Sequence, residues 1–460
     1  MTRVLFISHL FPPVGGTGVQ RAQKFVQYLP DEGFLPIVVA GPAREGDRWA
    51  PIDHTMTQKV PTNIPVYRVA GPVPPPPSKL RSRLERWAGL PSAFKQWWVH
   101  AATELACSVA DGAHLIFATM SPYESAHVAR EASSRLGIPW VADLRDPWAL
   151  DDIQIYPSFL HRKFEMTKME GLLSTAAAII MNTPVAAEDL KRAFPRLEQK
   201  TIVSITNGFD SEDFCGSIGS RTDTKFRIVH SGGMFTGSGL QLRNRNFYRG
   251  FGGVEKGIDI LTRSPEYLLR AIEQWIVRRP QVSSDLEIIF AGTITPDDRA
   301  LVNQSKAANF VQFRGFISHD ESLRLIRTAD LLFLPMHNLP LGKRCRSVPG
   351  KTYEYIASGR PILAAVPDGD AREFLRQCGT GFTCRPDDAK GMIEILDRVY
   401  LAWKDGRRCV CLNTDFVSRF ERRILTHALA DVFRVTLRKS RFAIQTQAMF
   451  AKSPAQQARF

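Results

Sequence analysis

Lys351 and Glu354 are the residues with the clearest capacity for chemistry, and both lie in the segment Gly350–Ala365. Their i, i+3 spacing puts both side chains on one face of a predicted helix, with Ser347 as its N-cap and Pro349 near its first turn. Free N–H groups at a helix start attract anions, and a carboxylate one turn further along can accept hydrogen bonds from sugar hydroxyls. The pattern suits a nucleotide, with phosphates at the helix start and ribose at Glu354. The alternative is that Glu354 is an ordinary solvated residue.

Two glycine pairs each follow a predicted strand. Gly15 and Gly16 come after the strand Arg3–Ser8, and Gly232 and Gly233 come after the strand Phe226–His230. Glycines let a ligand approach the backbone closely, and N–H groups at a helix start suit a phosphate. The first pair is not part of a GxGxxG fingerprint, so a simple dinucleotide site is not predicted. The alternative is that these glycines serve only the geometry of a turn.

Three charged residues, Asp143, Arg145 and Asp146, come just after the predicted strand Pro139–Ala142. In an open α/β sheet ligands bind at the carboxyl ends of the strands, so these side chains are expected at the edge of a cleft. Such groups can stabilise developing charge and orient a reacting hydroxyl. Equally, Arg145 could bridge the two aspartates as a structural ion-pair cluster. The sequence leaves both interpretations open.

A long loop rich in Gly, Asn and Arg follows the second glycine pair. It offers Arg243 and Arg245 as the preferred groups for neutralising phosphates, ahead of Arg249 and Lys256. Loops of this length are functional more often than short connectors are. The competing interpretation is a solvated loop without a ligand.

Alternating strands and helices are expected along most of the chain, which predicts two doubly wound α/β halves. The stretch from Ser211 to Lys225 is polar and is the predicted linker. We expect an N-terminal domain over 1–215, a C-terminal domain over 216–415, and C-terminal helices over 416–460 that return to the first half. The tail after Lys439 is expected to be weakly ordered.

The composition is that of a soluble globular protein, with 44% apolar and 23% charged residues among 460. The net charge of +14 favours anionic partners such as nucleotides, nucleic acids or anionic membranes. Nucleic acid is not an expected partner, because no recognition helix, zinc motif or RNA-binding motif supports it. No apolar run reaches the roughly 18–20 residues of a membrane span, and no signal-peptide layout is present.

No metal site and no cofactor are expected. The 7 cysteines are scattered and do not form a zinc-binding pattern, which favours a reduced cytoplasmic protein with free thiols. The adjacent pairs Asp151-Asp152 and Asp297-Asp298 are expected to be solvated residues in turns.

Basic and aromatic residues alternate over Lys79–Trp87 and Phe94–Trp98. A basic amphipathic stretch can lie on an anionic membrane, which would suit a lipid-linked substrate. The alternative, which we favour from the sequence, is a surface helix whose tryptophans pack into the first half.

The segment Lys351–Pro361 resembles the donor-binding helix of the large retaining glycosyltransferase family 4, which has the GT-B fold. Glu354, Ala357, Gly359 and Pro361 match the second half of the family pattern. The strand, Pro-containing loop, Gly-Gly and following helix at the N-terminus resemble the family's opening unit, and Gly232-Gly233 resembles the start of its donor domain. The loops at Gly292 and Phe316 are similar to the family's base-proximal loops, although Phe316 could also lie in the core.

The resemblance implies a GT-B fold, with two Rossmann-like domains facing across a cleft. It implies retaining transfer of a sugar from a nucleotide-diphosphate donor to a hydroxyl of a glycan or lipid-linked acceptor, with nucleotide-binding residues at Gly15, Gly16, Gly232, Gly233, Phe316, Lys351 and Glu354 and catalytic candidates at Asp143, Arg145, Asp146, Arg243 and Arg245. Synthesis of cell-surface polysaccharide or glycoconjugate, in the cytoplasm or at the inner face of the membrane, is the expected setting.

Two departures from the family pattern keep other functions open. The family's first glutamate would fall at Arg346, and the histidine that many members carry after an earlier strand is replaced by Thr119-Met120-Ser121-Pro122, which leaves His9 as a weak substitute. The alternatives are a non-catalytic GT-B scaffold that binds nucleotide sugars, or a GT-B epimerase or hydrolase.

Overall fold

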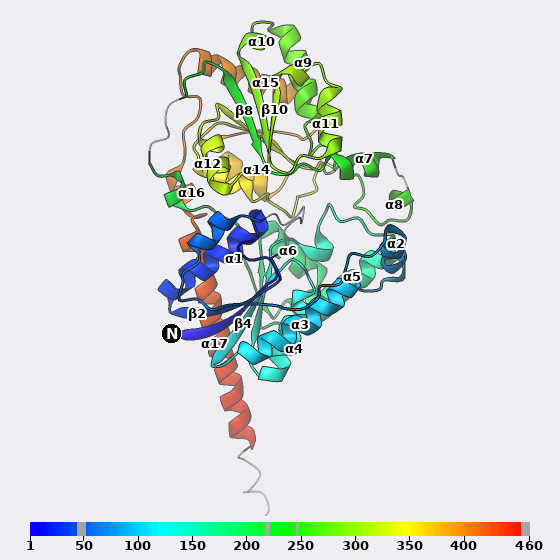
Figure 1. Cartoon of the computed structure of the whole chain (residues 1–460), viewed down its shortest axis with the longest axis vertical. Helices are drawn as coiled ribbons and strands as arrows, with labels where there is room; N and C mark the ends of the chain where they lie inside the picture. Colours follow the sequence, from blue (N-terminus) through cyan, green and yellow to red (C-terminus); the bar gives the residue numbers. More distant parts are fainter. Residues whose placement is uncertain (44–51, 217–220, 245–246, 452–460) are drawn as a thin grey trace, which may run out of the picture.

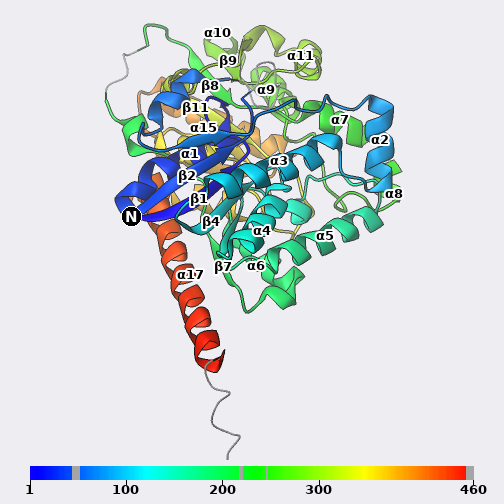
Figure 2. The same ribbon diagram turned by 60° about the horizontal axis from the view of Figure 1, so that its bottom comes forward.

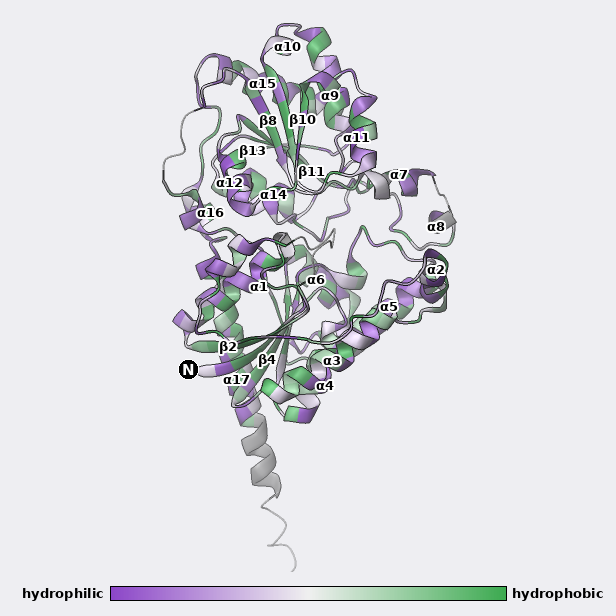
Figure 3. Ribbon diagram, viewed as in Figure 1, coloured by the Kyte–Doolittle hydropathy of each residue, from purple (hydrophilic) through white to green (hydrophobic). Residues whose placement is uncertain are grey.

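The computed structural model describes residues 1–43, 52–216, 221–244 and 247–451. Two parallel sheets, one in each half of the chain, are both flanked by helices (Figure 1). The strands of both sheets are predominantly hydrophobic, whereas the surrounding helices are mixed (Figure 3). Strands that are buried on both faces need such continuous apolar runs, so the doubly wound arrangement expected from the sequence is present.

The first sheet has seven strands in the order β3-β2-β1-β4-β5-β6-β7, and all its pairings are parallel. The order reverses direction between β1 and β4, which places a ligand-binding crevice beyond the ends of those two strands. The strands are β1 (Thr2–Ser8), β2 (Phe34–Ala40), β3 (Val66–Arg68), β4 (Ala113–Met120), β5 (Trp140–Leu144), β6 (Ala178–Met181) and β7 (Thr201–Ser204).

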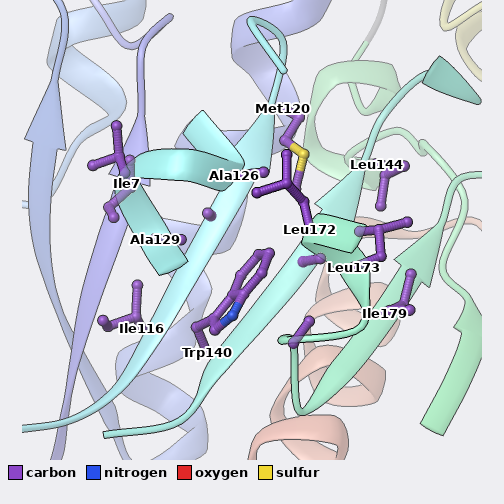
Figure 4. Packing of buried hydrophobic residues seen from close by; sticks show 14 of the residues in the cluster. Ile7, Ile116, Met120, Ala126, Ala129, Trp140, Leu144, Leu172, Leu173 and Ile179 are labelled. Atoms are coloured by element: carbon purple, nitrogen blue, oxygen red, sulfur yellow. The ribbon is translucent and has the colours of Figure 1, made fainter. Parts of the chain in front are cut away.

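Helices on both sides of this sheet close the first half. Figure 4 shows the apolar side chains on one side of the sheet, where Trp140 packs beside Ile116 and Ala129. The helices are α1 (Thr17–Tyr28), α2 (Lys79–Ala88), α3 (Ala93–Val109), α4 (Ser125–Leu136), α5 (Phe159–Leu173) and α6 (Pro184–Ala193).

The second sheet has six strands in the order β10-β9-β8-β11-β12-β13, again all parallel. Its switch point lies between β8 and β11, which end near Ser231 and Pro335. The strands are β8 (Phe226–Ser231), β9 (Leu286–Ala291), β10 (Val311–Gly315), β11 (Leu331–Pro335), β12 (Ile362–Ala365) and β13 (Gly381–Cys384).

The helices of the second half include the short α13 that carries Lys351 and Glu354. They are α7 (Thr236–Asn244), α8 (Phe247–Gly250), α9 (Glu266–Arg278), α10 (Val282–Asp285), α11 (Pro296–Asn303), α12 (His319–Arg327), α13 (Lys351–Ala357), α14 (Asp370–Gln377), α15 (Ala389–Lys404) and α16 (Thr414–Ser418). Short 3-10 helices occur at Leu29–Glu32, His54–Lys59, Trp148–Leu150, Pro195–Leu197, Ser211–Phe214 and Ala308–Phe310.

The last helix, α17 (Arg422–Ala451), leaves the second half and packs on the first (Figures 1 and 2). Leu429 and Phe433 belong to the same apolar cluster as Phe6 and Phe117 of the first sheet. The helix extends to Ala451. The weak order expected after Lys439 stays a prediction.

Candidate functional site

The switch point of the second sheet gathers the first group of polar residues. His230, at the end of β8, lies with Nδ1 3.0 Å from the carbonyl of Phe333 and with Nε2 3.0 Å from Nζ of Lys351. A carbonyl can only accept, so Nδ1 carries the proton and the lone pair of Nε2 accepts from the lysine. The ring fixes the position of the Lys351 ammonium at the cleft end of the strand.

Lys351 is buried, and no carboxylate of the described residues forms an ion pair with it. Burial lowers its pKa well below the usual value, and the neighbouring guanidinium of Arg263 lowers it further, although Glu354 opposes both. A side chain at residue 232 would collide with this lysine, because a Cβ there would lie 2.4 Å from Nζ. Gly232 also adopts φ 124°, which other residues avoid.

Arg263 is a cation of this site that the sequence pattern did not indicate. Its guanidinium lies 4.2 Å from the ring centre of Phe235, and burial lowers its pKa, while the nearby Asp151, Cys345 and Asp146 raise it. It influences the pKa of both His230 and Lys351, so it belongs to the same site. Arg263 lies shortly before α9, and this position could have marked it as a candidate. The cations chosen from the sequence lie instead inside the long insertion after Gly233.

Arg243 is engaged elsewhere. It forms ion pairs with Glu266 at 3.2 Å and Asp259 at 3.3 Å, so the structure does not bring it to the Lys351 site. Arg245 lies outside the described residues. Arg249 donates to the carbonyl of Ile258.

Glu354 lies one turn beyond Lys351 and joins residues from both halves. Its Oε1 is 3.8 Å from Nδ1 of His319, and the same nitrogen lies 3.0 Å from Nε2 of Gln20 on α1. Glu354 is buried, which excludes the alternative of a solvated helix residue. The expected N-cap at Ser347 is wrong: α13 begins after Gly350 with no side-chain cap, and it has only seven residues. An anion site here is therefore supported by the cations Lys351 and Arg263 and not by the N-terminus of α13.

The first half contributes a buried ionic layer beneath the cleft. Asp143 accepts from Arg21 at 2.7 Å and from the hydroxyl of Thr119 at 2.7 Å. Arg145 instead donates to backbone carbonyls, those of Met120, Ser121 and Gly18. The alternative in which Arg145 bridges two aspartates is therefore wrong. Both side chains hold the strand ends in place rather than facing an open cleft.

Asp146 and Asp151 are the acids whose charges act on Arg263. Asp146 is exposed, and its neighbours Arg145 and Pro147 are buried. Burial raises the pKa of Asp151 to about 7, and the charge of Asp146 adds to the shift. The expectation that Asp151 and Asp152 are solvated is wrong, because the chain folds both under the second half. Asp298 is also buried, where it caps α11 and accepts from Thr236.

Arg346, where the resemblance seen in the sequence would place a glutamate, joins the two halves. Its guanidinium pairs with Asp152 and, at 2.6 Å, with Asp189 on α6, and its carbonyl accepts from Thr183 at 2.8 Å. Asp370, also in the second half, accepts from the N–H of Val185 at 2.8 Å. The replacement of a carboxylate by a cation thus serves contact between the halves.

One cluster of metal-ligand types, Asp152, His337 and Cys345, has donor atoms within 4.8 Å of one another. Asp152 is already paired with Arg346, and burial, with the charge of Arg263 added, lowers the pKa of His337 to about 3. Burial raises the pKa of the Cys345 thiol to about 12. The positive charges of Arg346 and Arg263 beside this cluster oppose the binding of a divalent ion.

The remaining predicted residues lie at the rim. Gly16 is exposed at the start of α1 with φ 96°, and a Cβ at this position would meet no atom within 4 Å, whereas Gly15 before it is buried. Gly233 is exposed beside Gly232 with open space around it. Phe316 is 48% exposed, so the alternative that it lies in the core is wrong.

Comparisons with known proteins agree with this architecture. Residues 261–401 match the family model described as glycosyl transferases group 1, and no curated protein sequence matches the chain. Anabaena HepE, solved with UDP and glucose, is similar at 17% identity and a TM-score of 0.55, over 98% of this chain and 100% of that one.

Two further solved structures are similar across most of the chain. Sucrose-phosphate synthase from Thermosynechococcus elongatus has 16% identity and a TM-score of 0.58, over 98% of this chain and 100% of that one. S. aureus MnaA, solved with UDP, has 10% identity and a TM-score of 0.52, over 95% and 97%. The GT-B fold is confirmed, and the family match supports a protein of the GT-B glycosyltransferase superfamily. No helix in the described part of the chain is long and apolar enough to cross a membrane.

Proposed function

We propose that this protein is a retaining glycosyltransferase of family 4 that moves a sugar from a nucleotide-diphosphate donor to a hydroxyl of a glycan or glycolipid. The observation that carries the proposal is the buried Lys351 beside Gly232 at the switch point of the second sheet, together with the half-buried Arg263, whose charge acts on that lysine. A buried lysine without an anionic partner, next to a second cation, is costly unless an anionic ligand joins them.

The donor fits this site by charge and by hydrogen-bonding type. Lys351 and Arg263 neutralise the diphosphate, the backbone at Gly232 and Gly233 admits it closely, and Glu354 accepts hydrogen bonds from the ribose. Phe316 lies at the rim, where an exposed aromatic ring can contact the base. Gly15 and Gly16 cover the opposite side of the cleft and leave room for the phosphates.

The acceptor hydroxyl attacks the anomeric carbon from the side on which the diphosphate departs. The carbon–oxygen bond to the diphosphate breaks, the new glycosidic bond forms, and the hydroxyl proton passes to the departing phosphate oxygen. Cations at the leaving oxygen stabilise the charge that develops there. Asp146 and Asp151 orient the acceptor, while Asp143 and Arg145 position the strand ends from below. No metal and no other cofactor is needed for this chemistry.

Titration calorimetry with UDP, GDP and ADP tests the donor site. We expect one base series to bind, and we expect Lys351→Ala and Arg263→Ala each to weaken binding at least tenfold, since hydrogen bonds to charged groups contribute about 1.5–3 kcal/mol. Arg243→Ala is the matched control, because that guanidinium pairs with Glu266 and Asp259. Loss of affinity in Arg243→Ala alone would move the diphosphate to the insertion and contradict the assignment.

Arg346 supports a second candidate, a GT-B protein that binds nucleotide sugars without transferring them. The family's carboxylate is absent there, and its place is used for contact between the halves. Donor hydrolysis or transfer to added acceptors, measured as release of free nucleotide, separates the two candidates. An epimerase would convert the donor alone. We also propose domain limits at 1–215, 216–415 and 416–460. The proposed role is in cell-surface polysaccharide synthesis, in the cytoplasm or at the inner face of the membrane.

A further inference from the structure

The helix α2 carries large apolar side chains but adds nothing to the core. None of its residues is buried, and Leu80 and Leu84 are 69% and 62% exposed. These two leucines are one turn apart on one side of the helix. Leu90, just beyond its end, is 62% exposed. The sequence favoured a surface helix whose tryptophans pack into the first half. This is confirmed for Trp97 and Trp98 on α3, whereas Trp87 on α2 is 43% exposed.

The start of α5 exposes a second apolar group on the same side of the molecule. Phe159, Leu160 and Phe164 are each 61–62% exposed. The carbonyl of Trp87, on α2, lies 2.9 Å from Nε2 of His161, on α5, so the two helices are joined (Figures 1 and 2). We call the surface formed by the exposed apolar side chains of these helices the α2–α5 face; its residues are Leu80, Leu84, Leu90, Phe159, Leu160 and Phe164.

Cations flank this face. The helix α2 carries Lys79, Arg81, Arg83 and Arg86 against one acid, Glu85, and α5 adds Lys163. Every one of these five basic residues is exposed. Leucine and phenylalanine on one side and Lys/Arg beside them are the features of a helix that lies in a membrane interface. Exposed apolar patches of this kind mark contact with a partner or a membrane, and the charge matches anionic lipid head groups.

A pocket of about 1030 Å³ adjoins this face. Leu90, Leu160 and Phe164 line it where it is exposed, and the half-buried Tyr123 and the buried Trp148 line its inner end. The rings of Tyr123 and Trp148 stack with centres 4.8 Å apart. Burial raises the pKa of the Tyr123 hydroxyl, and the charges of Asp146 and Asp151 raise it further, which places these acids near the same end. A molecule held at the face could therefore extend a polar group toward the cleft.

We propose that the α2–α5 face binds the surface of an anionic lipid bilayer and that the adjoining pocket opens onto that bilayer. The consequence, that the acceptor is an amphiphile carried in the membrane, rests on the proposed function, whereas the binding itself does not. Peripheral attachment through this face leaves the second sheet and its nucleotide site in water.

Co-sedimentation of the full chain with vesicles tests the binding without any nucleotide or activity. We expect binding to vesicles of phosphatidylcholine with about 30% phosphatidylglycerol at about 0.1 M salt, and at least tenfold weaker binding to pure phosphatidylcholine, since each cation near the surface contributes about fivefold. Leu80→Ser/Leu84→Ser and Arg83→Gln/Arg86→Gln should each weaken binding at least tenfold. None of these side chains is buried, so circular dichroism should show an intact fold.

Val277→Ser/Arg278→Gln is the matched control, because it changes an exposed apolar residue and an exposed cation on α9 of the second half. Its vesicle binding should equal that of the unaltered protein. Equal binding to neutral and anionic vesicles, or no effect of the α2 variants, would overturn the proposal. So would a dimer in light scattering that the Leu80→Ser/Leu84→Ser change dissociates, because the face would then be a contact between two chains. A separate measurement of UDP affinity distinguishes failure of the proposed nucleotide site from failure of the membrane proposal.

Discussion

Burial shifts the pKa values of the ionisable residues at the cleft more than their immediate partners do. Lys351 and Arg263 both lose solvent, so the pKa of each falls, and the charge of Arg263 lowers that of Lys351 further. Asp151 loses solvent next to Asp146, so its pKa rises. An anionic donor reverses the first effect, because a diphosphate beside Lys351 favours the charged ammonium.

The lowered pKa of Lys351 leads to a prediction about proton uptake on nucleotide binding. When UDP binds at a pH above the depressed pKa of Lys351, the diphosphate should raise that pKa and the complex should take up a fraction of a proton. Calorimetry in buffers of different ionisation heat measures this uptake. Lys351→Met should abolish it, while Arg243→Ala should keep it. Proton release in place of uptake would contradict the role given to Lys351.

Asp151 makes a prediction about stability. Its pKa rises from the ordinary value of 3.8 to about 7 in the fold, so the folded state binds the proton more tightly than the unfolded state. The associated stability is fully present below about pH 4 and is lost as the pH rises through 7. Asp151→Asn removes this pH dependence. The free energy of unfolding of the variant minus that of the unaltered protein should therefore rise by about 2–4 kcal/mol from pH 4 to pH 8. Chemical denaturation at several pH values measures it, and a flat difference would refute the burial argument.

At the scale of elements, the turn after β8 needs a glycine at one position and tolerates a side chain at the next. Gly232→Ala would place a methyl group 2.4 Å from Nζ of Lys351 at φ 124°, and we expect a loss of about 1–3 kcal/mol in stability together with weakened nucleotide binding. Gly233→Ala, where a Cβ meets nothing within 4 Å, should change stability by less than about 0.5 kcal/mol. Thermal unfolding of both variants provides the comparison.

The segment before α13 joins the two halves through Arg346. Arg346→Ala would leave Asp152 buried without its cation, which costs about 3–5 kcal/mol. Arg344→Ala is the control, because its side chain is 53% exposed and its pairs with Glu188 and Asp370 are long, at 3.4 and 3.8 Å, so they should be worth less than about 1 kcal/mol. Small-angle scattering should show a larger radius of gyration for Arg346→Ala only. Equal compactness of the two variants would show that other contacts hold the halves together.

At the scale of the whole molecule, α17 makes the C-terminus part of the N-terminal core. Phe433 is fully buried, with its ring 5.3 Å from Phe34 and 5.6 Å from Phe117. Phe433→Ala should cost about 3–5 kcal/mol and lower the unfolding temperature of the first half. Val435→Ala, at an exposed position of the same helix, should cost less than about 1 kcal/mol. Denaturation followed by far-UV circular dichroism measures both losses.

The sequence by itself determined the two α/β halves and the glycine-bearing turns at their switch points. Apolar runs of strand length alternate with amphipathic helices, and this local pattern specifies parallel sheets whatever the distant contacts are. Lys351, Glu354 and Gly232 could also be singled out, because each stands in a local helix or strand–turn pattern that the sequence displays. Their contacts with His230, His319 and one another are tertiary.

Only the tertiary structure decided which charges meet. The charge of Arg263, beyond the insertion, lowers the pKa of Lys351. Asp143 pairs with Arg21 of α1, and Arg346 pairs with Asp152 and Asp189 of the other half. Burial of Asp151 arises in the same way, since the second half covers a turn that looks solvated in isolation. Ion pairing and desolvation depend on distances between residues far apart in the chain, and sequence spacing carries no record of those distances.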